Sequence, residues 1–195
     1  GSQKQERLEA FYGASLLALE AALIHRRGSG SAAQCLQTYR IWKLEMTRVL
    51  RTNSDNQDFI DLVKYLDADL AERDGKDHSF YAQFNKIDKI KYVVVAYENR
   101  KPVGCGAIKE YSPDTMEIKR MYTSPESRGK GIATKILTEL ETWATELSYE
   151  KCVLETGKRQ PEAIALYKKT GYQLIPNYGQ YAKIENSLCF EKIIK

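Results

Sequence analysis

The chain has 195 residues, with 30 Lys and Arg against 26 Asp and Glu and a formal net charge of +4. This length suits one domain of ordinary size with room for an appendage. The charge is mild and spread out, whereas nucleic-acid-binding proteins usually concentrate basic residues on one face. No apolar run approaches the roughly 18–20 residues that a membrane span needs, and residues 14–24 lack the cleavage site of a signal peptide. We therefore expect a cytoplasmic protein that binds neither nucleic acid nor membrane.

The cysteine and histidine residues favour neither a metal site nor a disulfide framework. They form no C-x-x-C pair, and the chain has few of them (Cys35, Cys105, Cys152 and Cys189; His25 and His78). We therefore expect no metal cofactor, and buried free thiols in a reducing compartment.

The first 45 residues differ from the rest and are predicted to form a helical N-terminal extension. Gly1-Ser2 is typical of a cloning scar, and the Gly-Ser-Gly-Ser run at 28–31 has the composition of a flexible linker. Apolar residues recur at helical spacing on both sides of that linker. Two interpretations stay open: a vector-derived or fused leader, with Met46 as an original start, or a genuine extension that docks on the domain, on a second copy or on a partner.

Residues 46–195 alternate between strand and helix patterns and are predicted to form the main domain. Strands are expected at 49–52, 92–97, 103–108, 117–123, 151–155, 173–175 and 187–192. Helices are expected from a cap at Asn53 or Ser54 to the Asp74-Gly75 turn, from 132 to about 147, and from 161 to 170. The order β-α-β-β-β-α-β-α-β-β indicates an α/β protein.

The most informative pattern lies at residues 121–133. A strand pattern ends at Ser124-Pro125, the glycine-rich stretch 128–131 follows, and a helix pattern begins at Ile132. The first N–H groups of a helix lack intrahelical partners and lie at the positive end of its dipole, so they can bind an anion. The stretch matches neither of the two commonest phosphate loops. A short glycine-rich helix start can also be purely structural, so the neighbouring motifs decide.

Two motifs in the right order make the chain resemble the GCN5-related N-acetyltransferase (GNAT) family. The order Arg128-x-x-Gly131-x-Ala133 after a strand resembles the acyl-CoA loop of that family. Some thirty residues later the family ending A-x-x-L-Y-x-x-x-G-[FY] is matched (Ala163, Leu166, Tyr167, Gly171 and Tyr172). The resemblance covers roughly residues 46–195. It implies the GNAT acyl-CoA N-acyltransferase fold, a central mixed sheet flanked by helices.

The resemblance also implies acetyl-CoA as co-substrate and places its binding site. The backbone of Met121, Tyr122 and Thr123 would run beside the pantetheine like an added strand. The loop N–H groups would hold the pyrophosphate (Arg128, Gly129, Lys130, Gly131, Ile132, Ala133 and Thr134). Many relatives carry an asparagine before the next helix where this chain has Gln160, whose amide is expected to reach the coenzyme from one methylene further out.

Acetyl transfer to an amine needs an acid for the leaving thiolate and a base for the amine. By resemblance Tyr167 is the acid, because a phenol with an ordinary pKa near 10 stays protonated; the alternative is a core aromatic residue that anchors its helix. Glu117 is the candidate base, although an ion pair with Lys119 on the same strand face competes with that role. Glu155 is the second candidate base, or else a carboxylate hydrogen-bonded to loop N–H groups.

The acceptor is less constrained by the sequence. Several polar and aromatic residues could shape a substrate pocket or only cover the sheet (Phe80, Tyr81, Phe84, Tyr178, Tyr181 and Asn186). A compact domain without an acidic patch favours a primary amine of a small molecule, which would attack directly because no cysteine lies in a nucleophile motif. The alternative is a non-catalytic acyl-CoA-binding sensor or interaction module that uses the N-terminal helices. Since many GNAT relatives dimerise, the resemblance also allows a homodimer.

Overall fold

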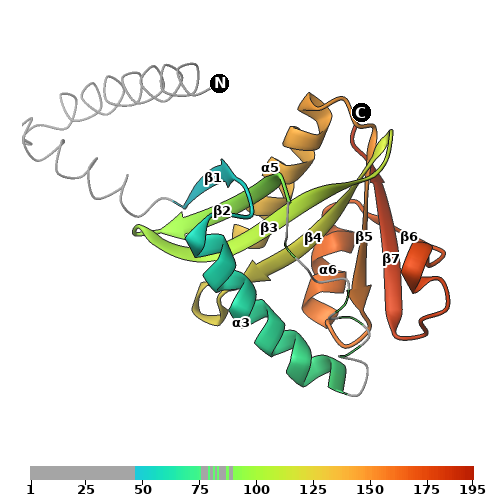
Figure 1. Ribbon diagram of the computed structural model, residues 1–195, viewed down its shortest axis with the longest axis horizontal. Helices are drawn as coiled ribbons and strands as arrows, with labels where there is room; N and C mark the ends of the chain where they lie inside the picture. Colours follow the sequence, from blue (N-terminus) through green and yellow to red (C-terminus); the bar gives the residue numbers. More distant parts are fainter. Residues whose placement is uncertain (1–46, 76–78, 80, 82, 84–86, 88–89) are drawn as a thin grey trace, which may run out of the picture. The chain divides into compact units, whose positions relative to one another are not determined.

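The computed structural model describes residues 47–75, 79, 81, 83, 87 and 90–195. The predicted N-terminal extension, Phe80 and Phe84 lie outside the described residues. Within the described part, helices pack on a seven-stranded mixed sheet, which confirms the predicted α/β class (Figure 1).

The elements follow the predicted order. The strands are β1 (Arg48–Thr52), β2 (Tyr92–Glu98), β3 (Lys101–Ser112), β4 (Thr115–Thr123), β5 (Lys151–Gly157), β6 (Gln173–Ile175) and β7 (Ser187–Ile193). The helices are α3 (Gln57–Asp74), α5 (Ile132–Glu146) and α6 (Pro161–Lys169), with the short turns η2 (Pro125–Ser127) and η3 (Gly179–Tyr181). The hairpin between β3 and β4 is longer than predicted, because pairing continues to Ser112 and Thr115.

Helices cover both faces of the sheet. The strand order is β1-β2-β3-β4-β5-β7-β6, and every neighbouring pair is antiparallel except β4 with β5. Val94 and Ala96 pack into the core cluster that holds α5 and α6, whereas Val93 and Val95 pack into the cluster under α3. This alternation follows from the two-residue period of a strand. The sheet is therefore buried on both sides at β2.

The parallel strands β4 and β5 separate at their C-terminal ends (Figure 1). Their pairing runs only from Thr115↔Lys151 to Ile118↔Leu154, although both strands continue beyond it. At the point of separation β4 carries a bulge, because Cys105 pairs with Tyr122 while Ala107 pairs with Lys119. Arg120 in the bulge has φ 58°, a left-handed conformation that costs energy in a non-glycine residue. Residues 119–123 of β4 therefore have no β5 partner, and their backbone edge faces the gap between the two strands.

Helix α5 lies so close to β3 and the bulge that only glycine fits beneath it. A Cβ on Gly106 would stand 2.5 Å from Met121 Sδ and 2.9 Å from both Ile136 Cγ2 and Leu140 Cδ1. A side chain at this position would push α5 away from the sheet or displace Met121. Gly106 therefore fixes the position of Met121 at the mouth of the gap.

The start of α3 corrects one prediction. Neither Asn53 nor Ser54 caps the helix; the N-cap is Asn56, whose side-chain oxygen accepts a hydrogen bond from Phe59 N at 3.0 Å. Asn53 Oδ1 instead accepts a hydrogen bond from Asp55 N at 2.9 Å, which forms a local Asx turn. The helix therefore starts two or three residues later than predicted.

Three cysteines are described, and the structure agrees with the expectation for them. Cys105, Cys152 and Cys189 are free thiols buried in the sheet. Among the described helices, none is long and apolar enough to cross a membrane. Over the same residues, no group of three or more His, Cys, Asp or Glu side chains is placed to hold a metal ion.

Candidate active site

A groove of about 340 Å³ runs from the gap between β4 and β5 to the start of α5. Ten of the eleven residues predicted to bind the coenzyme line it (Met121, Tyr122, Thr123, Arg128, Gly129, Gly131, Ile132, Ala133, Thr134 and Gln160). Lys130 does not line the groove; its Nζ lies 3.1 Å from Glu98 Oε2 on the other side of the loop. We call this groove the donor groove.

The loop at the N-terminal end of α5 has the geometry of an anion site. Gly129 and Gly131 adopt φ of 78° and 80°, which favours glycine at both positions, and nothing lies within 4 Å of a Cβ built on either. Gly131 caps α5 without a side chain, so the helix start has no side-chain acceptor for its N–H groups. A phosphate group fits this open cradle, which is lined by backbone donors and stands at the positive end of the helix dipole.

Arg128 supplies the positive charge at this end of the groove. Its Nε donates to the carbonyl oxygen of Thr123 at 3.1 Å, and its Nη2 lies 3.5 Å from Asp69 Oδ2. The Thr123 contact holds the guanidinium against the end of β4. Asp69 Oδ1 also lies 2.9 Å from Arg73 Nε, so the ion pair of Asp69 with Arg128 is the longer and weaker of the two. Arg128 can therefore turn to a bound anion at little cost.

A second cavity of about 90 Å³ adjoins the donor groove, and we call it the acceptor cavity. Four residues line both spaces (Leu66, Met121, Gln160 and Tyr167). The other residues of the acceptor cavity are mostly polar (Leu70, Asp74, Tyr81, Glu117, Ile118, Lys119, Arg120, Glu155, Thr156, Gly157 and Tyr181). The two spaces therefore meet beside the bulge, at Met121 and Tyr167.

Tyr167 is a core residue, as one of the two interpretations of the sequence expects. It also lines both spaces, as a residue that acts on the substrates would. Its side chain is 5% exposed, and its ring packs against Tyr172 and Phe190 at centroid distances of 5.8 and 6.1 Å. Burial raises the pKa of the Tyr167 phenol well above its usual value. The hydroxyl therefore stays protonated at neutral pH.

Both carboxylate oxygens of Glu117 are engaged. Oε2 lies 3.1 Å from Lys119 Nζ, and Oε1 accepts a hydrogen bond from the Tyr178 hydroxyl at 3.2 Å. The expected ion pair with Lys119 is thus present, and Tyr178 acts through Glu117 because it does not itself line the acceptor cavity. Burial, with the charge of Glu117 beside it, raises the pKa of the Tyr178 phenol.

Glu155 has a different environment. Its Oε1 accepts a hydrogen bond of 2.6 Å from Ser187 Oγ, and Ser187 Oγ lies 3.0 Å from the hydroxyl of Tyr81. Burial raises the pKa of the Glu155 carboxyl to about 7, although the Ser187 hydrogen bond and the Lys119 charge favour the ionised form. Its partner is the side chain of Ser187, not the loop N–H groups that the sequence suggested.

Of the remaining residues predicted to shape the pocket, some line the acceptor cavity and others do not. Tyr181 lines the acceptor cavity, as does Tyr81. Asn186 lines neither space, and its carbonyl accepts a hydrogen bond from Lys158 N at 2.8 Å. Gln160 lines both spaces as the residue that precedes α6. Ser187 was not predicted as a site residue, because a serine at the start of a strand carries no distinguishing pattern.

Comparisons with known proteins agree with this geometry. The sequence profile of the acetyltransferase (GNAT) family matches residues 59–172. The IAA acetyltransferase of Azospirillum brasilense is 36% identical over 100 residues, which are 51% of this chain and 65% of that protein. The uncharacterized N-acetyltransferase YjgM of Escherichia coli is 39% identical over 87 residues, which are 43% of this chain and 52% of that protein. The chain thus spans about half to two thirds of the length of these curated relatives.

Solved structures share the fold. A Klebsiella pneumoniae protein described as an acyl-CoA N-acyltransferase has a TM-score of 0.66 and 27% identity, over 77% of this chain and 99% of that one. The PaiA N-acetyltransferase of Thermoplasma acidophilum, in complex with coenzyme A, has a TM-score of 0.55 and 17% identity, over 76% and 99% of the two chains. An Elizabethkingia anophelis acetyltransferase with acetyl-CoA bound has the same TM-score and identity, over 75% and 97%. Because the family profile covers more than half of the sequence, the chain belongs to the GNAT acetyltransferase family.

Proposed function

We propose that the chain is an enzyme that transfers an acetyl group from acetyl-CoA to a primary amine of a small molecule. The observation that carries this proposal is the meeting of the donor groove and the acceptor cavity at Met121 and Tyr167. A donor lying along β4 would present its acetyl group where the acceptor cavity opens. The similar structures that hold coenzyme A or acetyl-CoA support the choice of donor.

The donor groove suits both ends of such a molecule. Its glycine loop admits a phosphate, and Arg128 adds a positive charge there. The edge of β4 at residues 121–123 has no partner strand across the gap, so its backbone groups can pair with the amides of a pantetheine arm. Bound acetyl-CoA supplies an acetyl group activated as a thioester.

Two kinds of side chain would handle the protons. An amine attacks only as the free base, and a carboxylate of the acceptor cavity, Glu117 or Glu155, is placed to accept its proton. Tyr167 lines both spaces and keeps its proton because burial raises the pKa of its phenol. It can therefore donate that proton to the departing sulfur.

The acceptor cavity supports a compact amine. Its volume of about 90 Å³ leaves room for little more than the reacting end of the acceptor. Its charged lining is mixed, with the carboxylates Asp74, Glu117 and Glu155 beside the cations Lys119 and Arg120, so it can receive the amine as the free base. Direct attack fits this arrangement, because the described cysteines are buried in the sheet and line neither space.

Titration calorimetry with acetyl-CoA tests the donor groove. We expect one-to-one binding by the wild-type protein, and an affinity about 10- to 100-fold lower in Arg128→Ala, because a charge-assisted contact to phosphate is lost. The matched control is Arg48→Ala, which removes the same charge from an exposed position on β1. No binding by a folded wild-type sample would overturn the proposal.

Turnover is the second part of the test. A panel of small primary amines is screened for release of free thiol from acetyl-CoA, with the wild-type protein and with Tyr167→Phe. Thiol release that depends on both the amine and the Tyr167 hydroxyl supports an acetyltransferase. Binding without turnover across the whole panel would instead favour a non-catalytic acyl-CoA sensor.

A further inference from the structure

We infer that Glu155, not Glu117, takes the proton of the acceptor amine, and that Ser187 is the residue that positions Glu155 for this role. The inference rests on the proposed function. It concerns a chain of three side chains beside the acceptor cavity, Tyr81, Ser187 and Glu155, which we call the relay; Tyr81 and Glu155 line the cavity, and Ser187 joins them. None of its links is local in sequence, since Ser187 is 32 residues from Glu155 and 106 residues from Tyr81.

The strand pairing explains how the relay forms. β5 and β7 are antiparallel, with Gly157 opposite Ser187 and Glu155 opposite Cys189. Ser187 is the first residue of β7. Its side chain lies on the same side of the sheet as that of Glu155, because Glu155 is two residues from Gly157 on β5. Ser187 is 2% exposed, and its hydroxyl contacts the side chains of Glu155 and Tyr81. The short contact of 2.6 Å from Ser187 Oγ to Glu155 Oε1 makes Ser187 the donor and Tyr81 the donor behind it.

Geometry separates the two candidate bases. Glu117 has one oxygen on the Lys119 ammonium and the other on the Tyr178 hydroxyl, so an incoming amine would have to displace one of them. Glu155 accepts a hydrogen bond from Ser187 at Oε1, and its carboxylate lines the acceptor cavity. Its partial exposure is toward that cavity, which also borders Tyr167. A carboxylate held at one oxygen can offer the other to the amine.

The electrostatic surroundings suit a base that works near neutral pH. The charged and titratable groups that face Glu155 come from all the elements around it (Asp74 on α3; Glu117 and Lys119 on β4; Tyr167 on α6; Tyr181 on η3; Cys189 on β7). Tyr81 contacts it through Ser187. Burial dominates this set and raises the pKa of Glu155 to about 7. A base of this strength is ionised for much of the time at pH 7 and still has useful affinity for a proton.

The proton and electron balance is closed by residues already named. The amine nitrogen forms the new bond to the acetyl carbon, and the carbon–sulfur bond breaks with its electron pair on sulfur. Glu155 accepts the proton that the amine loses, and Tyr167 gives a proton to the sulfur. Solvent then removes the proton from Glu155 and restores the one on Tyr167, so no further reactant is needed.

The test is the pH dependence of kcat/KM with an amine found in the screen. We expect wild-type activity to fall as pH decreases through about 7. Ser187→Ala removes a hydrogen bond that favours the ionised form, so the midpoint should move to higher pH. Ser187→Thr keeps the hydroxyl, so it should have the wild-type midpoint. If Ser187 had only a structural role, the midpoint would not depend on the hydroxyl. Glu155→Gln should lower kcat by about 100- to 10,000-fold. Glu117→Gln should cost less activity and move the midpoint to lower pH, because the negative charge of Glu117 helps to raise the pKa of Glu155.

A second readout keeps the inference separate from the proposed function. ¹³C NMR of carboxyl-labelled glutamate follows the titration of Glu155 without turnover, and calorimetry with acetyl-CoA confirms that each variant is folded. An unchanged NMR midpoint in Ser187→Ala would overturn the positioning role, and full activity of Glu155→Gln would overturn the assignment of the base. If no amine is acetylated but the NMR midpoint moves as expected, the proposed function has failed while the coupling of Ser187 to Glu155 is confirmed.

Discussion

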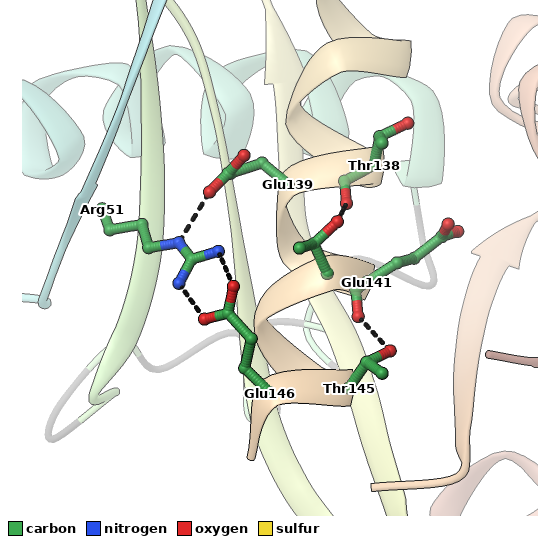
Figure 2. A network of polar contacts seen from close by, with 7 residues as sticks. Arg51, Thr138, Glu139, Glu141, Thr145 and Glu146 are labelled. Carbon is green, nitrogen blue, oxygen red and sulfur yellow. Dashed lines mark hydrogen bonds and ion pairs between the residues drawn. The ribbon is translucent and has the colours of Figure 1, made fainter. Parts of the chain in front are cut away.

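Two clusters of polar side chains lie on opposite sides of the sheet, and both contain glutamate carboxylates that serve different ends. The edge cluster, Arg51, Glu139 and Glu146, joins β1 to α5 (Figure 2). The cavity cluster comprises the relay together with Glu117 and Lys119, and it lines the acceptor cavity or supports its lining. In the edge cluster one guanidinium faces two carboxylates. In the cavity cluster Glu155 lacks a cation of its own.

The pKa directions record this difference. In the edge cluster the hydrogen bond from Arg51 lowers the pKa of Glu146, whose side chain is 54% exposed. In the cavity cluster burial raises the pKa of Glu155. A carboxylate with a cation partner stays ionised and only holds the structure together, whereas one held by a hydroxyl in a buried place can exchange a proton near neutral pH.

Besides the loss expected for Glu155→Gln, a large effect on activity comes from removing the hydroxyl oxygen of Tyr167 beside the cavity cluster. Tyr167→Phe leaves the ring packed against Tyr172 and Phe190, but it removes the proposed acid, so we expect kcat to fall about 100-fold or more. The dissociation constant for acetyl-CoA and the free energy of unfolding should change little. The matched control is Tyr172→Phe, a neighbouring buried tyrosine that lines neither space. Equal losses of activity in the two variants would contradict the role of Tyr167.

The next effect concerns stability and has opposite signs in the two clusters. Since the folded state raises the pKa of Glu155 from 4.5 to about 7, it binds that proton more tightly than the unfolded chain does. The resulting stabilisation is complete below about pH 4.5 and is lost as pH rises through about 7. Glu155→Gln removes the cost of burying the charge, so at pH 8 the variant should be more stable than wild type by roughly 1–3 kcal/mol. At pH 4 the two proteins should be alike.

Urea unfolding at a series of pH values measures this difference. Glu146→Gln is the control from the edge cluster. Because the folded state lowers the pKa of Glu146, its stabilisation is present at neutral pH and disappears in acid, the reverse of Glu155. A stability difference for Glu155→Gln that does not vary with pH would show that the pKa of Glu155 is unperturbed.

The donor groove could be predicted from the sequence because its signals are local. A strand, two glycines with flanking basic residues and a helix start occupy 121–134, and the chain folds them into one groove with ten of the eleven predicted residues. The exception, Lys130, pairs with Glu98 from β2. No sequence pattern shows that distant carboxylate, so a basic residue in the loop was assigned to the ligand.

The acceptor cavity could be predicted only in part, because its contacts join distant segments. Glu117 and Lys119 are two residues apart on one strand, so their ion pair followed from strand periodicity. The relay depends instead on the pairing of β5 with β7 and on Tyr81 from another part of the chain. The bulge at Arg120 contains no glycine, so the sequence does not indicate a left-handed residue there. Both features arise from tertiary contacts, and single-residue patterns do not carry them.

The smallest expected effect tests whether the edge cluster is only structural. Arg51 lies 4.9 Å from the centre of the Trp143 ring as well as between two carboxylates, all near the surface. Arg51→Met keeps the apolar stem over Trp143 and removes the charge, so we expect a loss of about 1 kcal/mol in the free energy of unfolding, because exposed ion pairs contribute little. Since salt screens such pairs, the difference from wild type in urea unfolding should shrink in 1 M NaCl. Glu155→Gln, by contrast, should keep its difference at high salt, because that difference comes from desolvation. If Arg51→Met also lowered kcat, the edge cluster would influence the site across the sheet, and the division between the two clusters would be wrong.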